Sequence, residues 1–134
     1  PASLASDAAA TVEGRWRAGS IDFPARVLDL GAMGVTLAGG DAARLGDRAA
    51  ARSVYRADAG WLVCWMFRGS IAELPPTDDV RAHGDFVFHV YRRDGRTLVF
   101  WQEGEIVCAL VGEGDPEGVV ALAFAKAMAP PARA

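Results

Sequence analysis

The sequence predicts an α+β domain. We expect an antiparallel sheet of about six strands, ordered much like a meander, with a C-terminal helix packed on it and an irregular N-terminal arm. Short apolar runs separated by turn residues fill positions 33–112, as is typical of hairpin-linked strands. Positions 115–129 begin with Asp115-Pro116-Glu117 and continue with apolar residues, as is typical of a buried helix. Positions 1–24 show neither pattern and form the expected arm.

The arm is expected to lie on the core. Its first ten residues are small and rich in alanine, which is typical of a frayed helix or of a disordered lead-in. Beyond them, Trp16, Ile21 and Phe23 are separated by glycines. Large apolar side chains without helical or strand spacing indicate an irregular segment that covers part of the sheet.

The first half of the sheet is predicted to contain three strands. Val35-Thr36-Leu37 forms a short strand, and Gly39-Gly40 after it suits a bulge or a close approach of two backbones. Positions 48–56 alternate in the manner of a strand, and positions 61–67 are the most hydrophobic stretch of the chain. In the latter stretch Trp61, Val63, Trp65 and Phe67 share one face, and Leu62, Cys64 and Met66 share the other.

The second half begins with a long exposed connection over positions 71–85, which contains Pro75-Pro76. A strand over 86–91 and one over 96–102 are joined by Asp94-Gly95, a strong hairpin signal. The strand over 106–111 is apolar on both faces, which predicts a central position in the sheet. The helix over 115–129 is stopped by Pro130-Pro131.

Composition limits the classes of function. The chain has 134 residues, of which 51% are hydrophobic, and a net charge of −3. This length suits a single domain over 1–134, and the acidic balance argues against nucleic acid as a partner. No apolar run of about 18 residues is present, so no segment is expected to span a bilayer. Because the chain begins with Pro1, we expect it to be part of a longer protein.

No group of residues predicts catalysis, so we expect no enzyme, no cofactor and no bound metal. His83 and His89 are the histidines of the chain, and no ligand-spacing motif accompanies them. His89 could join Met66 and the two cysteines as a soft ligand set, but buried sulfur groups and a half-exposed imidazole are the simpler interpretation. The carboxylate pairs Asp78-Asp79 and Glu103/Glu105 fall on turns, where solvated charges are usual.

Cys64 and Cys108 leave two alternatives open. They fall near the centres of the third and sixth predicted strands, which a simple meander keeps apart. This separation favours two buried thiols. A sheet that closes or reorders could instead bring them together as a disulfide.

Trp61, Trp65 and Phe67 are the candidate interaction surface. Their face carries more apolar area than one terminal helix covers. We therefore expect it to meet either the N-terminal arm or a second copy of the domain.

Short motifs follow one another along the chain in a recognisable order. They are Thr11-Val12, Trp16, Ile21-Asp22-Phe23-Pro24, Val27-Leu28-Asp29-Leu30, Gly34-Val35-Thr36-Leu37-Ala38-Gly39-Gly40, Gly46-Asp47-Arg48-Ala49-Ala50, Val54-Tyr55-Arg56, Leu98-Val99-Phe100-Trp101 and Val107-Cys108-Ala109-Leu110-Val111-Gly112. In this order, the sequence resembles the extracytoplasmic C-terminal domain of bacterial transmembrane anti-sigma factors over nearly its whole length. Departures are Glu13-Gly14-Arg15 before Trp16, Ala10 where the family often has histidine, and Asp41 where it normally has arginine.

The resemblance implies a periplasmic sensor domain that is tethered to the inner membrane. One transmembrane helix would join it to a cytoplasmic domain that holds an extracytoplasmic-function sigma factor, and so regulates transcription in a stress response. The implied partner is a protein or an unidentified signal outside the membrane, and the sigma factor is reached only through the cytoplasmic domain. A free periplasmic module that binds a ligand or acts as a chaperone is the alternative.

Overall fold

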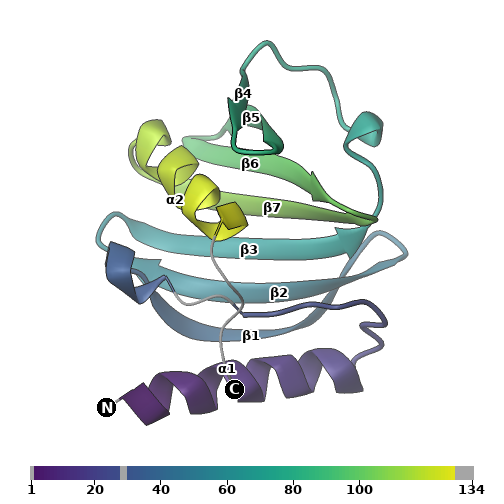
Figure 1. The fold of residues 1–134 in the computed structure, drawn as a ribbon, viewed down its shortest axis with the longest axis vertical. Coiled ribbons are helices and arrows are strands. Elements are labelled where there is room, and N and C mark those ends of the chain that lie inside the picture. The colour runs from purple at the N-terminus through teal and green to yellow at the C-terminus, as the bar shows by residue number, and fades with distance from the viewer. Residues whose placement is uncertain (1, 28–29, 129–134) are drawn as a thin grey trace.

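The computed structural model describes residues 2–27 and 30–128, in which one antiparallel sheet has the strand order β1-β2-β3-β7-β6-β5-β4 (Figure 1). The strands are β1 (Thr36–Leu45), β2 (Arg48–Ala57), β3 (Gly60–Arg68), β4 (Val80–His83), β5 (Phe86–Arg93), β6 (Arg96–Glu103) and β7 (Ile106–Glu113). The helices are α1 (Ala2–Ala18), α2 (Pro116–Met128) and two 3-10 turns, η1 (Gly31–Met33) and η2 (Ile71–Glu73). The predicted α+β class, with a meander-like sheet and a C-terminal helix, is confirmed.

The sheet consists of two meanders joined edge to edge. Strands β1 to β3 form the first and β4 to β7 the second, and the join is the antiparallel pair β3–β7. Strand β4 follows β3 along the chain but does not pair with it. It lies at the far edge of the sheet (Figure 1). Strand β7 is therefore central, as its apolar sequence predicts.

Both helices and the segment between α1 and β1 cover the same face of the sheet. Helix α2 packs against β6 and β7, and α1 packs along β1 (Figure 1). The core lies beneath them, where Leu62, Cys64 and Met66 of β3 meet Val120 of α2 and Trp16 of α1. The other alternate residues of β3 therefore point to the opposite side, which we call the open face.

The prediction of an irregular N-terminal arm is wrong for the first part of the arm, which forms helix α1. Val12 and Trp16 are four residues apart, so they share one helix face, and they are 2% and 1% exposed. The Trp16 Nε1 atom donates hydrogen bonds to the carbonyl oxygens of Asp41 at 3.0 Å and Arg52 at 3.2 Å. The arm is irregular only after Gly19, and there Ile21 and Phe23 are buried as expected.

The Gly39-Gly40 pair marks a β-bulge, as predicted. The β1–β2 register shifts between Leu37 and Gly39. At Gly40, a Cβ atom would lie 2.5 Å from the Arg52 carbonyl oxygen and 2.6 Å from Val12 Cγ1. Only glycine lets α1 approach the sheet this closely.

One strand of the sheet, β4, was not predicted from the sequence. Strand β4 lies inside positions 71–85, which we expected to be an exposed connection, and it pairs with β5 from Val80↔His89 to His83↔Phe86. It has four residues and lies at the sheet edge, so it lacks the apolar alternation of a half-buried strand. The rest of the connection is irregular apart from η2.

The helix start at the C-terminal end is confirmed. The Asp115 side chain accepts a hydrogen bond from the Glu117 amide at 3.2 Å, and Pro116 is the first helical residue. Residue 129 and the Pro130-Pro131 stop lie outside the described residues, as do Leu28 and Asp29 of the resembling motifs.

We predict that Gly40→Ala lowers the free energy of unfolding by about 1–3 kcal/mol, because the new methyl group overlaps backbone and helix atoms. Gly39→Ala is the matched control, since a Cβ atom there has no neighbour within 4 Å. Urea unfolding of both variants measures the difference. Equal stability of the two variants would contradict the close approach at Gly40.

Candidate functional site

A row of three side chains crosses the open face where β1, β2 and β3 run side by side. Asp41, Arg52 and Trp65 are direct register partners on these strands. The Arg52 guanidinium donates to both Asp41 oxygens, at 2.8 Å and 2.7 Å, and lies 5.2 Å from the centre of the Trp65 ring. The Asp41 partner raises the pKa of Arg52. The row therefore presents a fixed cation between a carboxylate and an aromatic surface.

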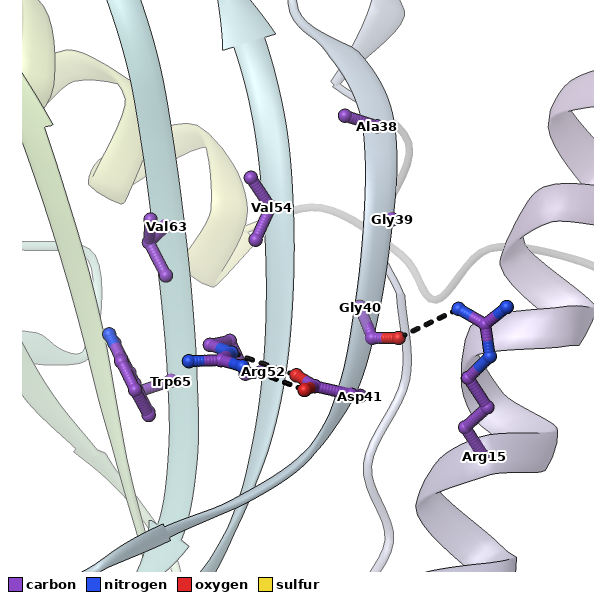
Figure 2. Close-up of a pocket in the computed structure, with 9 residues that line it drawn as sticks. All are labelled: Arg15, Ala38, Gly39, Gly40, Asp41, Arg52, Val54, Val63 and Trp65. Carbon is purple, nitrogen blue, oxygen red and sulfur yellow. Dashed lines mark hydrogen bonds and ion pairs between the residues drawn. The ribbon is translucent and has the colours of Figure 1, made fainter.

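Beside this row lies a shallow depression of about 460 Å³ (Figure 2). The bulge residue Gly39 has no side chain to fill it, so Val54 and Val63 form an apolar floor. Arg15 of α1 reaches its rim and donates to the Gly40 carbonyl oxygen at 3.0 Å. The depression combines an apolar floor with charged edges, which is typical of a surface that binds another molecule.

The predicted interaction residues lie on this open face. Trp61 is 48% exposed, and its ring lies 4.6 Å from the Arg56 guanidinium carbon. Trp65 and Phe67 are half-buried. The expectation that the N-terminal arm covers them is wrong, because α1 and the segment after it lie on the opposite face. The other alternative, contact with a second copy of the domain, stays a prediction.

Cys64 and Cys108 are free, buried thiols. The strand separation that we expected is wrong, because β3 and β7 are neighbours and Cys64 faces Leu110 while Cys108 faces Met66. The two cysteines are thus offset by two residues on one face. Such diagonal positions are about 7–8 Å apart, which is too far for an unstrained disulfide. Burial raises the pKa of Cys108 well above its ordinary value, so its thiol is protonated and unreactive.

The side chains considered as metal ligands do not converge. His83 stacks on Phe124 of α2 with ring centres 4.2 Å apart. His89 lies on the open face, while Met66 and the cysteines lie beneath the helices. Within the described residues, no group of three His, Cys, Asp or Glu side chains could hold a metal ion.

A second hollow, which the sequence analysis missed, lies beneath α2. It has a volume of about 330 Å³ and is lined by residues that include Phe23, Met66, Cys108 and Lys126. Lys126 is 3% exposed although it is the lysine of an otherwise apolar helix face. Its spacing from Val119 and Ala123, seven and three residues earlier, is the sequence signal that predicts its burial.

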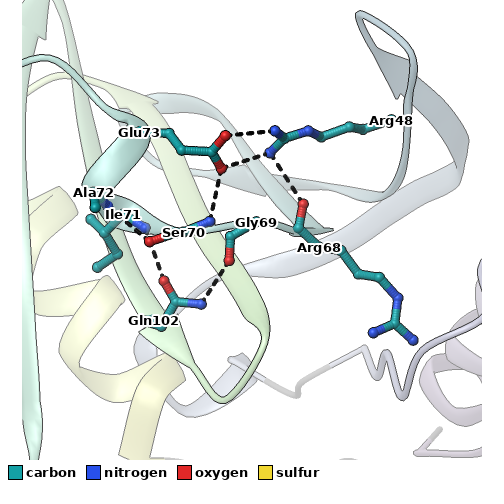
Figure 3. Close-up of polar contacts among 8 residues, drawn as sticks. All are labelled: Arg48, Arg68, Gly69, Ser70, Ile71, Ala72, Glu73 and Gln102. Atoms are coloured by element: carbon teal, nitrogen blue, oxygen red, sulfur yellow. Dashed lines mark hydrogen bonds and ion pairs between the residues drawn. The ribbon is translucent and has the colours of Figure 1, made fainter.

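A polar network holds the connection after β3 in place (Figure 3). The Gln102 side chain accepts a hydrogen bond from the Ile71 amide and donates one to the Gly69 carbonyl oxygen. Ser70 caps η2 and Glu73 returns to the Ser70 amide, so the two form a capping box. The Arg48 guanidinium on β2 donates to both Glu73 oxygens, at 3.1 Å and 2.7 Å. This network is structural, because each of its polar groups already has a partner.

Comparisons with known proteins bear on the fold. No protein-family model and no curated protein sequence matches the chain. A solved structure that matches is a GTP-binding regulator from Thermotoga maritima, with a TM-score of 0.50 and 13% sequence identity over 66% of this chain and 74% of the regulator. At this identity the likeness concerns the fold alone. In residues 2–27 and 30–128, no helix is long and apolar enough to cross a membrane.

We predict two reactive thiols per chain when the unreduced protein is denatured and titrated with a thiol reagent. The reason is the diagonal offset of Cys64 and Cys108, which prevents a bridge without movement of the strands. Protein reduced beforehand is the control and should give the same value. A titre of zero would show that the bridge exists.

We predict that Glu73→Gln destabilises the domain at neutral pH but not in strong acid. The hydrogen bonds from Arg48 lower the pKa of Glu73 to about 2, compared with 4.5 ordinarily. A lowered carboxyl pKa contributes stability above the unfolded pKa, and this is lost as the pH falls toward the folded pKa. Urea unfolding at several pH values should show the difference between wild type and variant vanish between about pH 4.5 and pH 2.

Arg48→Gln is the partner control for this prediction. At neutral pH it should lower the free energy of unfolding as much as Glu73→Gln does. The double variant should be little less stable than either single variant. A difference that persists unchanged down to pH 2 would show that the carboxylate charge is not responsible.

Proposed function

We propose that the chain is the periplasmic sensor domain of an anti-sigma factor anchored in the inner membrane, which controls an extracytoplasmic-function sigma factor. The observation that carries this proposal is where the resembling motifs lie. Trp16 and Phe23 are buried between α1, the segment after it and the sheet, and Gly40 lies where α1 approaches the sheet most closely. These three residues of the resembling motifs thus lie where α1 and the segment after it are joined to the sheet, which supports the proposal.

The open face supports a role in binding a partner. Trp61, Trp65 and the depression beside Arg52 leave aromatic and apolar surface accessible next to fixed charges. Exposed apolar patches of this kind commonly mark protein interaction sites. A partner outside the membrane that binds one state of the domain more tightly would shift the equilibrium between sigma retention and release.

The test of this proposal uses the full-length protein in bacterial cells. Alkaline phosphatase fused after residue 134 should be active, because that enzyme requires the periplasm, and the fusion should sediment with membranes. Mass spectrometry of the purified full-length protein should identify a bound sigma factor. A product that is cleaved and released into the periplasm would favour the alternative, a free module that binds a ligand or acts as a chaperone. An inactive fusion would exclude both.

We predict that Trp61→Ser combined with Trp65→Ser abolishes the stress response of a sigma-dependent reporter in cells with the full-length protein. Aromatic side chains commonly contribute about 2 kcal/mol or more each at the centre of an interface. Val87→Ser is the matched control, because Val87 is 47% exposed on the same face but lies on β5. Circular dichroism of the isolated domain checks that each variant folds. An unchanged response in the double variant would exclude this part of the open face as the partner site.

A further inference from the structure

The hollow beneath α2 has the dimensions of a small-molecule site. Ligand sites are usually concave spaces of about 300–1,000 Å³ with mostly apolar walls and a few polar groups. This one, at about 330 Å³, lies where α2, β7 and the segment after α1 meet. Phe23, Met66 and Ile106 supply apolar wall, and Lys126 supplies a cation. The size suits a small ligand.

Lys126 is buried and forms no ion pair with a described residue. It is 3% exposed, and no hydrogen bond or salt bridge joins its ammonium group to any described residue. The Lys126 Nζ atom lies over the Trp101 ring, 5.6 Å from the ring centre. A buried charge is costly unless it is paired and hydrogen-bonded. An anion that enters the hollow would supply both.

Three of the other charged groups at the hollow already have hydrogen-bond or ion-pair partners. The Glu103 carboxylate accepts a hydrogen bond from Trp101 Nε1 at 2.7 Å, and Arg68 forms ion pairs with Glu105 at 3.1 Å and with Asp22. Arg26 adds a further cation at the exposed rim. Lys126 and Arg26 are therefore the two cations at the hollow that form no ion pair with a described residue.

Burial disfavours the charged form of Lys126, whereas the Glu103 carboxylate at the same hollow favours it, and the pKa of Lys126 is raised. The group is therefore an ammonium at neutral pH.

We propose that this hollow binds a small amphipathic carboxylate. The carboxylate pairs with Lys126 Nζ, and the apolar part of the ligand lies against Phe23, Met66 and Ile106. That such a ligand is the signal for sigma release rests on the function proposed above, whereas its binding to the domain does not.

The test exploits the fact that Lys126 is the chain's single lysine. Protein labelled with ¹³Cε-lysine gives one side-chain resonance, which reports on this site alone. Octanoate should shift the resonance saturably, and 1-octanol, the neutral probe of equal chain length, should bind at least about tenfold more weakly because it cannot form the ion pair. Inorganic phosphate, which lacks an apolar part, should produce no saturable shift at the same concentrations.

Variants provide a second measurement by calorimetry. Lys126→Met keeps an unbranched apolar side chain, so it should remove the preference for octanoate over 1-octanol. Arg96→Met is the control: it removes an exposed cation at the start of β6 and should leave both affinities unchanged. If Lys126→Met fails to fold, the comparison of the three probes on the wild-type protein still tests the proposal.

Three outcomes would overturn the proposal. They are a lysine resonance that octanoate does not shift, equal affinity for octanoate and 1-octanol, and a saturable response to phosphate as strong as that to octanoate. None of them depends on the location of the domain in the cell. Failure here is therefore distinguishable from failure of the membrane and sigma-factor experiment.

Discussion

The antiparallel pairing of β3 with β7 is the contact on which the rest of the structure depends. It joins two groups of strands that are each connected by short turns, and it places the two most apolar strands side by side in the middle of the sheet. On the covered side, Cys64 and Leu110 are paired under the helices. On the other side, Trp65 is paired with Ala109, whose small side chain leaves the indole ring accessible.

This pairing gives the domain two dissimilar faces. The helices, α1 over β1 and α2 over β6 and β7, bury the core on one side. Because both lie on that side, the open face keeps its aromatic side chains at the surface, with Arg52 and Arg56 stacked over two of them. The hollow around Lys126 forms on the covered side, where α2 and the irregular segment after α1 meet without filling the space. One sheet thus carries an exposed aromatic surface on one side and a partly open hollow on the other.

The sequence predicted those features that local chemistry determines. The Asp115-Pro116 helix start, the Gly39-Gly40 bulge and the alternation of β3 depend on neighbouring residues, and the structure contains each of them. Features that depend on distant contacts were missed. Helix α1 is weakly amphipathic on its own and acquires its place by inserting Trp16 against β1 and β2. The β3–β7 pair and the edge strand β4 likewise have no local signature, because partner choice is settled by the whole sheet.

The same distinction between local sequence signals and distant contacts applies to the candidate sites. The placement of the candidate interaction residues Trp61 and Trp65 on one face of β3 could be predicted from sequence, because the alternation of a strand is visible without a structure. Lys126 was missed although its spacing places it on the buried face of the helix, because a single cation in an apolar helix is ordinarily expected to reach solvent. Its burial follows from the place of α2 over β7, which in turn follows from the pairing of β7 with β3. The resembling motifs, by contrast, supply framework residues such as Trp16 and Gly40. The proposed membership in that family therefore rests on framework residues, whereas the binding roles proposed for the open face and the Lys126 hollow rest on side chains outside that framework.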